Sequence, residues 1–308
     1  MRYFTRVLIA LHLGFIIPQI ASAQIILQYK IYGKEEFKSA KQSDEKASYE
    51  KTNPLFRFRI PYPASGTDFY ALIELQRDDK ILNPRGIANE TLRSGNVITQ
   101  DKFPRLLRSD LYHIGVGYRA SGIHQFFYGL QISENTAGTD AVDDTRFYTN
   151  LFVYDYYYAK NAYFRFLAGA VNNPTYSFYF VAPAYYYEGE KIHVRITPVY
   201  LRTYYDLNDK WQVNFKVNED SRFYRLNSKD FDRQLLKYTG RELNTGIQYR
   251  FSENLLFNLD FGYQVFSELK FFPEHYKDAD RLGKDTIGIK PAPYAALYIT
   301  LGPRNHPE

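Results

Sequence analysis

Nine charged side chains occupy polar positions of segments in which apolar and polar residues alternate, so they can act together inside a folded chain. Seven are basic and two are acidic: Arg57, Arg59, Arg119, Arg165, Arg202, Lys216, Arg250, Glu74 and Asp260. Fixed charges of one sign along a narrow aqueous path raise the local concentration of the opposite ion. These residues predict an anion-favouring conduit if the path is open. If the interior is plugged, the same charges must find partners there, because an unpaired buried ion is costly.

Other chemistry has weaker support. The histidines downstream of the N-terminal segment show no Ser/His spacing that suits nucleophilic catalysis: His113, His124, His193, His275 and His306. The acidic group Asp140, Asp143 and Asp144 lacks EF-hand spacing, so a solvated loop is the better interpretation. There is no cysteine, and therefore no disulfide or thiolate metal ligand. We predict no enzyme activity, no metal site and no cofactor.

The elements that carry the nine charges are predicted to be β-strands. In residues 241–251 apolar and polar residues alternate, and the alternation resumes after the turn 252–254 and continues to residue 265. A period of two indicates strands with one apolar and one polar face. Strands of about ten residues with many aromatic side chains are typical of membrane β-barrels. The 30 Tyr and 24 Phe also suit the aromatic girdles of such barrels.

Thirteen segments are candidate strands: 25–33, 55–62, 68–77, 110–119, 123–133, 146–158, 161–171, 175–187, 191–205, 210–218, 241–251, 255–266 and 292–302. Some are joined by turns of two to four residues, and others by the long charged segments 34–52, 78–108, 219–240 and 267–291. Short periplasmic turns and long outer loops are the pattern of outer-membrane barrels. The predicted fold is all-β: a single closed antiparallel transmembrane β-barrel of about 12 strands (range 10–14). Residues 25–33 are the candidate left out of the twelve.

One candidate, residues 191–205, conflicts with this scheme. The turns 188–190 and 206–209 at its two ends are both expected at the periplasmic side, and one strand cannot join two turns on the same side. Its apolar positions also shift from even to odd numbers at Thr197-Pro198. Proline is confined to bulges, edges and strand ends. We expect either two short strands or one bulged strand here.

The first 23 residues are predicted to be a signal peptide. Arg2 and Arg6 precede an apolar run that ends at Ala21-Ser22-Ala23, a small-x-small cleavage site. The apolar run is shorter than the roughly 20 residues that a membrane-spanning helix needs, which argues against an anchor. The predicted organisation is residues 1–23 as signal peptide and residues 24–308 as the barrel, in the outer membrane of a Gram-negative bacterium after cleavage near Ala23.

Charge and composition narrow the partners. The formal charge of +5 falls to +3 without Arg2 and Arg6, which is too small and too dispersed to predict nucleic-acid binding. The expected partners are outer-membrane lipid and the barrel-assembly machinery, with small solutes as candidate cargo. The sequence leaves the oligomeric state open.

Part of the sequence resembles a known family. The resemblance lies in residues 183–187, 192–198 and 204–211 and in the hairpin of 244–251 with 257–263, and it covers about residues 110–302. The chain is similar there to an uncharacterised family of Gram-negative outer-membrane β-barrels defined by a domain of unknown function. The resemblance implies fold and location but no activity. The chain departs from the usual outer-membrane ending, because residues 303–308 follow where a terminal aromatic residue is common.

Three classes of function remain after this reasoning. The favoured one is a non-enzymatic outer-membrane barrel that acts as a passive channel or has a structural or surface-contact role. The second is a membrane-embedded lipid-remodelling enzyme. The third is a soluble periplasmic β-barrel or sandwich that binds a ligand, for which the negative mean hydropathy is ordinary.

Overall fold

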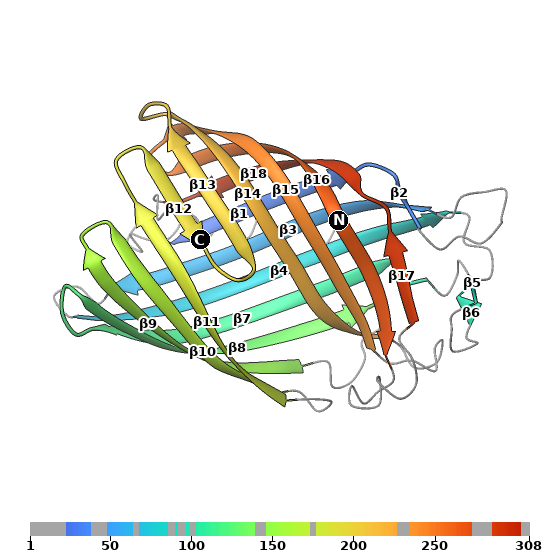
Figure 1. Cartoon of the computed structure of the whole chain (residues 1–308), viewed down its shortest axis with the longest axis horizontal. Helices are drawn as coiled ribbons and strands as arrows, with labels where there is room; N and C mark the ends of the chain where they lie inside the picture. The colour runs from blue at the N-terminus through green and yellow to red at the C-terminus, as the bar shows by residue number, and fades with distance from the viewer. Residues whose placement is uncertain are drawn as a thin grey trace.

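The described part of the chain forms a closed barrel (Figure 1). The structure, a computed structural model, describes residues 23–37, 48–63, 68–85, 90–91, 97–98, 103–138, 146–172, 177–226, 235–272 and 285–302. Among them, fourteen antiparallel strands pair in sequence order, and β1 closes the ring by pairing with both β3 and β18. No helix among these residues is long and apolar enough to cross a membrane.

The fourteen wall strands are β1 (Gln24–Tyr32), β3 (Ser48–Pro63), β4 (Phe69–Arg85), β7 (Leu106–Arg119), β8 (His124–Ala137), β9 (Arg146–Ala159), β10 (Ala162–Asn172), β11 (Ser177–Glu188), β12 (Ile192–Ile196), β13 (Tyr200–Asp206), β14 (Trp211–Leu226), β15 (Leu235–Ser252), β16 (Leu255–Phe272) and β18 (Ala292–Leu301). Four shorter strands lie outside this ring. They are β2 (Glu35–Glu36), which pairs with β3; β17 (Asp285–Ile289), which pairs with β16; and β5 (Glu90–Thr91), which pairs with β6 (Val97–Ile98).

The predicted fold class is confirmed, but the strand number exceeds the expected twelve and stands at the upper limit of the predicted range. Residues 25–33, left out of the count, form β1 and complete the ring. The doubtful segment 191–205 is two strands, β12 and β13, joined by a tight turn. In that turn the Thr197 hydroxyl accepts hydrogen bonds from the backbone N–H groups of Val199 and Tyr200. This split places the connections 189–191 and 207–210 at the same end of the barrel.

The two ends of the barrel differ. One end, called the turn end, carries the start of β1, the end of β18 and the short connections 120–123, 160–161, 189–191, 207–210 and 253–254. The other end is called the loop end. There the strands are longer than predicted, because parts of the predicted loops, namely 48–52, 78–85, 219–226, 235–240 and 267–272, are strand. These segments are rich in charged residues that pair with one another inside the barrel, so their polarity did not indicate loops.

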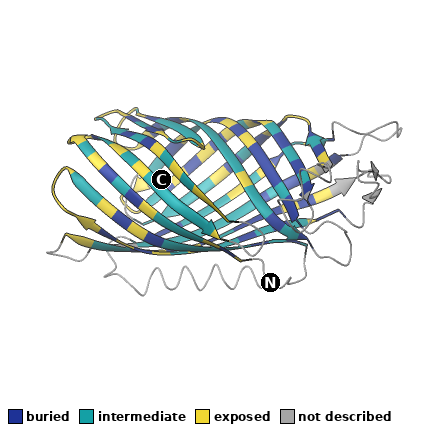
Figure 2. Ribbon diagram, turned by 60° about the horizontal axis from the view of Figure 1, so that its bottom comes forward, coloured by how far each residue is buried: buried dark blue, intermediate teal, exposed yellow. Residues whose placement is uncertain are grey.

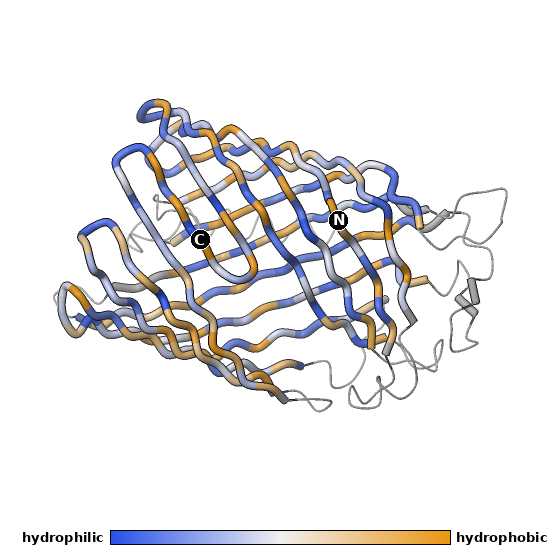
Figure 3. Tube along the Cα trace, viewed as in Figure 1, coloured by the Kyte–Doolittle hydropathy of each residue, from blue (hydrophilic) through white to orange (hydrophobic). Residues whose placement is uncertain are grey.

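Apolar side chains are exposed on the outer face of the wall, and polar side chains are buried on its inner face. Ile247, Leu259 and Leu297 lie side by side on neighbouring strands with 40%, 39% and 46% of their surfaces exposed. On the inner face, Asp260 is fully buried and Gln264 nearly so. Burial and hydropathy alternate along many of the wall strands (Figures 2 and 3). An outward apolar band is what lipid contact requires, and it argues against the soluble alternative.

The wall is lowest at β12 and β13, which have five and seven residues, whereas β14, β15 and β16 have 16 to 18. β11 therefore pairs with β12 only through Tyr185–Glu188. β14 pairs with β13 up to Asn218 and then, at Arg225 and Leu226, in parallel with the end of β8. Near the loop end, β14 therefore pairs directly with β8, and strands β9 to β13 do not lie between them.

The loop end of the interior is filled by an apolar core, called the plug. Its thirteen buried residues come from wall strands, from β17 and from the segments before β7 and after β2: Phe37, Leu82, Phe103, Leu107, Ala137, Tyr224, Leu226, Leu236, Tyr238, Leu269, Phe271, Ile287 and Ile289. Burial of apolar area stabilises this closure. The space that remains inside the barrel lies between the plug and the turn end.

Candidate functional site

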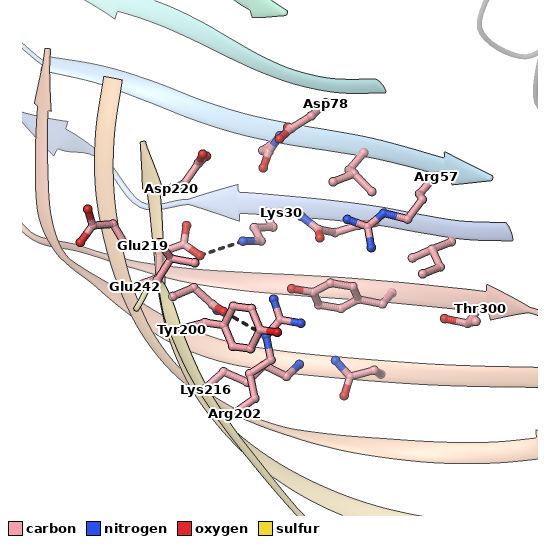
Figure 4. A pocket seen from close by; sticks show the side chains of 18 of the residues that line it. Lys30, Arg57, Asp78, Tyr200, Arg202, Lys216, Glu219, Asp220, Glu242 and Thr300 are labelled. Atoms are coloured by element: carbon pink, nitrogen blue, oxygen red, sulfur yellow. Dashed lines mark hydrogen bonds and ion pairs between the residues drawn. The ribbon is translucent and has the colours of Figure 1, made fainter. Parts of the chain in front are cut away.

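The first interior space, called the polar cavity, is lined by residues of β1, β3, β4, β13, β14, β15, β16 and β18 (Figure 4). Its volume is about 270 Å³. Five basic and four acidic side chains contribute to its lining: Lys30, Arg57, Arg202, Lys216 and Arg222, with Asp78, Glu219, Asp220 and Glu242. The opposite charges are interspersed, so the cavity presents a nearly balanced set of charges.

Ion pairs hold the wall of the polar cavity together. The Lys30 ammonium lies 2.8 Å from a carboxylate oxygen of Glu242, whose other oxygen accepts a hydrogen bond of 2.5 Å from the Tyr32 hydroxyl. Lys216 pairs at 2.8 Å with the buried Asp260. A buried charge without a partner is strongly destabilising. These pairs therefore let the charges face a narrow interior.

A second ionic group lies next to the plug. The Arg222 guanidinium is 2.7 Å from the Asp78 carboxylate, and Lys80 is 2.9 Å from Asp220 and 3.5 Å from Asp78. Lys80 also lies 3.4 Å from the hydroxyl of Tyr224, a residue of the plug. The plug and this ionic group together close the described interior toward the loop end.

The second interior space, called the apolar cavity, lies on the side of β4 to β11 and has a volume of about 490 Å³. Leu72, Phe127 and Val153 form a buried cluster along it. Its main charged pair is Arg165 with Asp155, joined by two hydrogen bonds of 2.8 and 3.0 Å. The tip of the β12–β13 hairpin, called the hairpin tip (residues 197–200), borders this cavity. Val199 and Tyr200 of the tip line both cavities.

The structure places the nine charged candidates as follows. Arg57, Arg202 and Lys216 line the polar cavity, and Arg59 and Arg165 line the apolar cavity. Glu74 lies 3.3 Å from Arg57 and 3.8 Å from Arg59, and Asp260 pairs with Lys216. Arg119 and Arg250 lie near the turn end, exposed and half-buried respectively. The cationic candidates are thus distributed over two cavities.

The sequence reasoning missed all five acids that line the two cavities: Asp78, Asp155, Glu219, Asp220 and Glu242. The sequence analysis set seven basic groups against only two acids. With these further acids inside the barrel, the excess of basic groups on which the predicted anion preference depended is no longer present. Asp155 was missed because β9 is apolar on both faces: inward Leu151 and Val153 line the apolar cavity while Phe152 is exposed outside. The available signal was that Asp155 is an isolated charge within an aromatic run, and such a charge needs a partner.

The histidines do not form a catalytic site within the described residues. His193 is the best connected: one ring nitrogen lies 2.8 Å from Glu188 and the other 2.9 Å from Asp206. The two carboxylates are on opposite sides of the ring, so they cannot share a metal ion with it. The described residues contain no group of three or more His, Cys, Asp or Glu able to hold one. His275, His306 and the group Asp140, Asp143 and Asp144 lie outside the described residues.

Comparisons with known proteins give distant similarities. No family model matches the sequence, and no curated protein matches it. Among solved structures, the toluene transporter TodX of Pseudomonas putida has 9% identity and a TM-score of 0.43 over 96% of this chain and 92% of that one. A FadL homologue of Pseudomonas aeruginosa has 8% identity and a TM-score of 0.46 over 91% and 89%. The KdgM porin has 7% identity and a TM-score of 0.32 over 91% and 99%. These scores are too low to transfer a ligand or a route to this chain.

Proposed function

We propose that the protein is a non-enzymatic, passive channel of the outer membrane. The observation that carries this proposal is the hollow interior of a closed transmembrane barrel: two cavities of about 270 and 490 Å³ meet at the hairpin tip. The signal peptide fits the same account, because Gln24, the residue after its predicted cleavage site, is buried as the first residue of β1.

The plug sets the kind of channel. With the loop end closed by apolar side chains, we expect a narrow route with low ion conductance, unlike that of a wide, water-filled porin. Phe103 is almost fully buried in the plug, 5.6 Å from Phe37 between ring centres. In planar bilayers, Phe103→Ala should raise the small wild-type conductance. Phe251→Ala removes a ring that is 67% exposed near the turn end and should leave the conductance unchanged.

The test of function is uptake by intact Gram-negative cells that lack their own major porins. Glycine, arabinose and 4-nitrophenol span the range from polar to largely apolar small solutes. Cells that carry the folded barrel should take up at least one of them faster than vector cells, without an energy source. If none enters faster while heat-modifiable migration on a gel shows a folded barrel, the channel proposal is wrong and the structural or surface-contact role replaces it.

A further inference from the structure

The short hairpin of β12 and β13 leaves a gap in strand pairing, called the side opening. One side of it is β11 between residues 179 and 184, and the other is β14 between residues 220 and 224. Its base is the hairpin tip, and its far end is closed where β14 pairs with β8. No described strand pairs with either edge inside these limits. Figure 1 shows no strand between β11 and β14 beyond the hairpin tip.

The length of the hairpin places this opening within the membrane. Seven residues at about 3.3 Å each, tilted by about 40°, span roughly 18 Å along the barrel axis, whereas the apolar band is about 25 Å tall. The hairpin starts at the membrane surface on the turn side, where the connections 189–191 and 207–210 are exposed and include charged residues. Its tip therefore ends inside the apolar band, and the opening faces the half of the bilayer nearer the loop end.

The apolar cavity reaches the side opening. Its lining includes Phe180 and Ala182 on β11 and Pro198 and Val199 at the hairpin tip, which are the two borders of the opening. Val199 is 52% exposed, so other side chains leave about half of its surface uncovered. The cavity volume of about 490 Å³ lies within the usual range for small-molecule sites. Apolar side chains of the cavity lining thus lie at both borders of the side opening.

The chemistry of the edges limits what can pass. Strand edges carry backbone N–H and C=O groups, and each such group left unsatisfied in hydrocarbon costs several kcal/mol. Acyl chains alone would leave these groups unsatisfied. A molecule with an apolar body and a hydrogen-bonding group can pair with one of these backbone groups as it passes, while its body contacts the apolar walls. Pro183, which has no N–H, removes one donor from the β11 backbone.

We infer that the side opening connects the apolar cavity with the bilayer, and that small, largely apolar molecules carrying one hydrogen-bonding group pass through it. The inference rests on the proposed channel function and gives it a substrate class and a route. The axial exit on the loop side is closed by the plug, so on that side of the apolar cavity the side opening is the route that remains.

The test uses tryptophan fluorescence, because the chain has a single tryptophan, Trp211. Trp211→Phe provides the background, and Phe180→Trp places a reporter inside the apolar cavity at the opening. Tyr298→Trp is the matched control, since Tyr298 lines the polar cavity behind β18, which is paired on both sides. Leu259→Trp is the lipid-facing reference.

In vesicles of lipids brominated at mid-chain, we expect the reporter at position 180 to be quenched nearly as strongly as that at 259, and the reporter at 298 to be quenched far less. 4-Bromophenol should quench the reporter at 180 saturably. A bulky maleimide on Val199→Cys should reduce both effects, while the same label on Val116→Cys, on the outer surface of β7, should not.

Equal lipid quenching at 180 and 298, or no saturation with 4-bromophenol, would overturn the inference. Lipid contact does not depend on transport, so uptake without quenching at 180 refutes the route, and no uptake of any solute refutes the channel.

Discussion

Replacing Asp155 by Asn tests how the interior tolerates charge. The Asp155 carboxylate is 3% exposed and receives two hydrogen bonds from Arg165, whose side chain is 20% exposed beside the apolar cavity. Removing one partner of a fully buried ion pair costs about 3–5 kcal/mol. The amide introduced at position 155 would still accept one hydrogen bond, and Arg165 is in partial contact with water. We therefore expect a loss of about 2–3 kcal/mol in the free energy of unfolding, close to the value of one hydrogen bond to a charged group.

The assay is urea unfolding of the barrel in phospholipid vesicles, with Glu134→Gln as the control. Glu134 pairs with Arg146 at 2.6 Å, but the two side chains are 32% and 60% exposed. An exposed pair contributes about 0–1 kcal/mol. The double variant Asp155→Asn with Arg165→Met should recover most of the loss, since no unpaired charge remains. If Asp155→Asn costs no more than the control, or if the two changes are additive, the ion pair does not have this role.

The remaining predictions concern lipid contact, ion selectivity and export. Leu259→Arg should cost about 2–4 kcal/mol of unfolding free energy near the midplane, and Asn258→Arg, which faces the interior beside Asp260, should cost less; equal costs would mean that the faces are reversed. Under a salt gradient in planar bilayers, the wild-type reversal potential should stay near zero, and Asp260→Asn should shift it toward anions because Lys216 loses its carboxylate; a strongly anion-selective wild type would contradict the pairing. N-terminal sequencing of the protein from outer membranes should begin at Gln24, and an intact N-terminus would refute the cleavage.

The sequence predicted the fold where one face of a strand meets lipid and the other meets water. In β16 the alternation assigned Leu259 to the outside and Asp260 to the inside, as the structure has them. The phase shift at Pro198 located the break between β12 and β13. These signals are local, because a period of two needs only the residues of one strand.

The loop-end halves of the strands could not be predicted in this way. Asp78, Asp79 and Lys80 are consecutive charged residues that read as loop, yet all three are buried in β4. Asp78 and Lys80 pair with side chains of β14, and Asp79 pairs with Arg108 of β7. The signal for strand is lost when charged residues are neutralised by partners far away in the sequence.

The site was less predictable than the fold because its contacts depend on closure of the ring. Lys30 and Glu242 are 212 residues apart, and they meet only because β1 pairs with β18. The apolar cavity likewise needs inward apolar residues on β4, β8 and β9, which alternation had no means to separate from lipid-facing ones. The side opening follows from the lengths of β12 and β13, which the sequence did not determine beyond the break at Pro198.

The most direct test of the central claim is the initial rate of 4-nitrophenol entry into intact cells as a function of its concentration. A passive channel predicts a rate above that of vector cells that rises with concentration and does not change when an uncoupler abolishes the proton gradient. A rate equal to that of vector cells, or one that an uncoupler abolishes, would contradict the account.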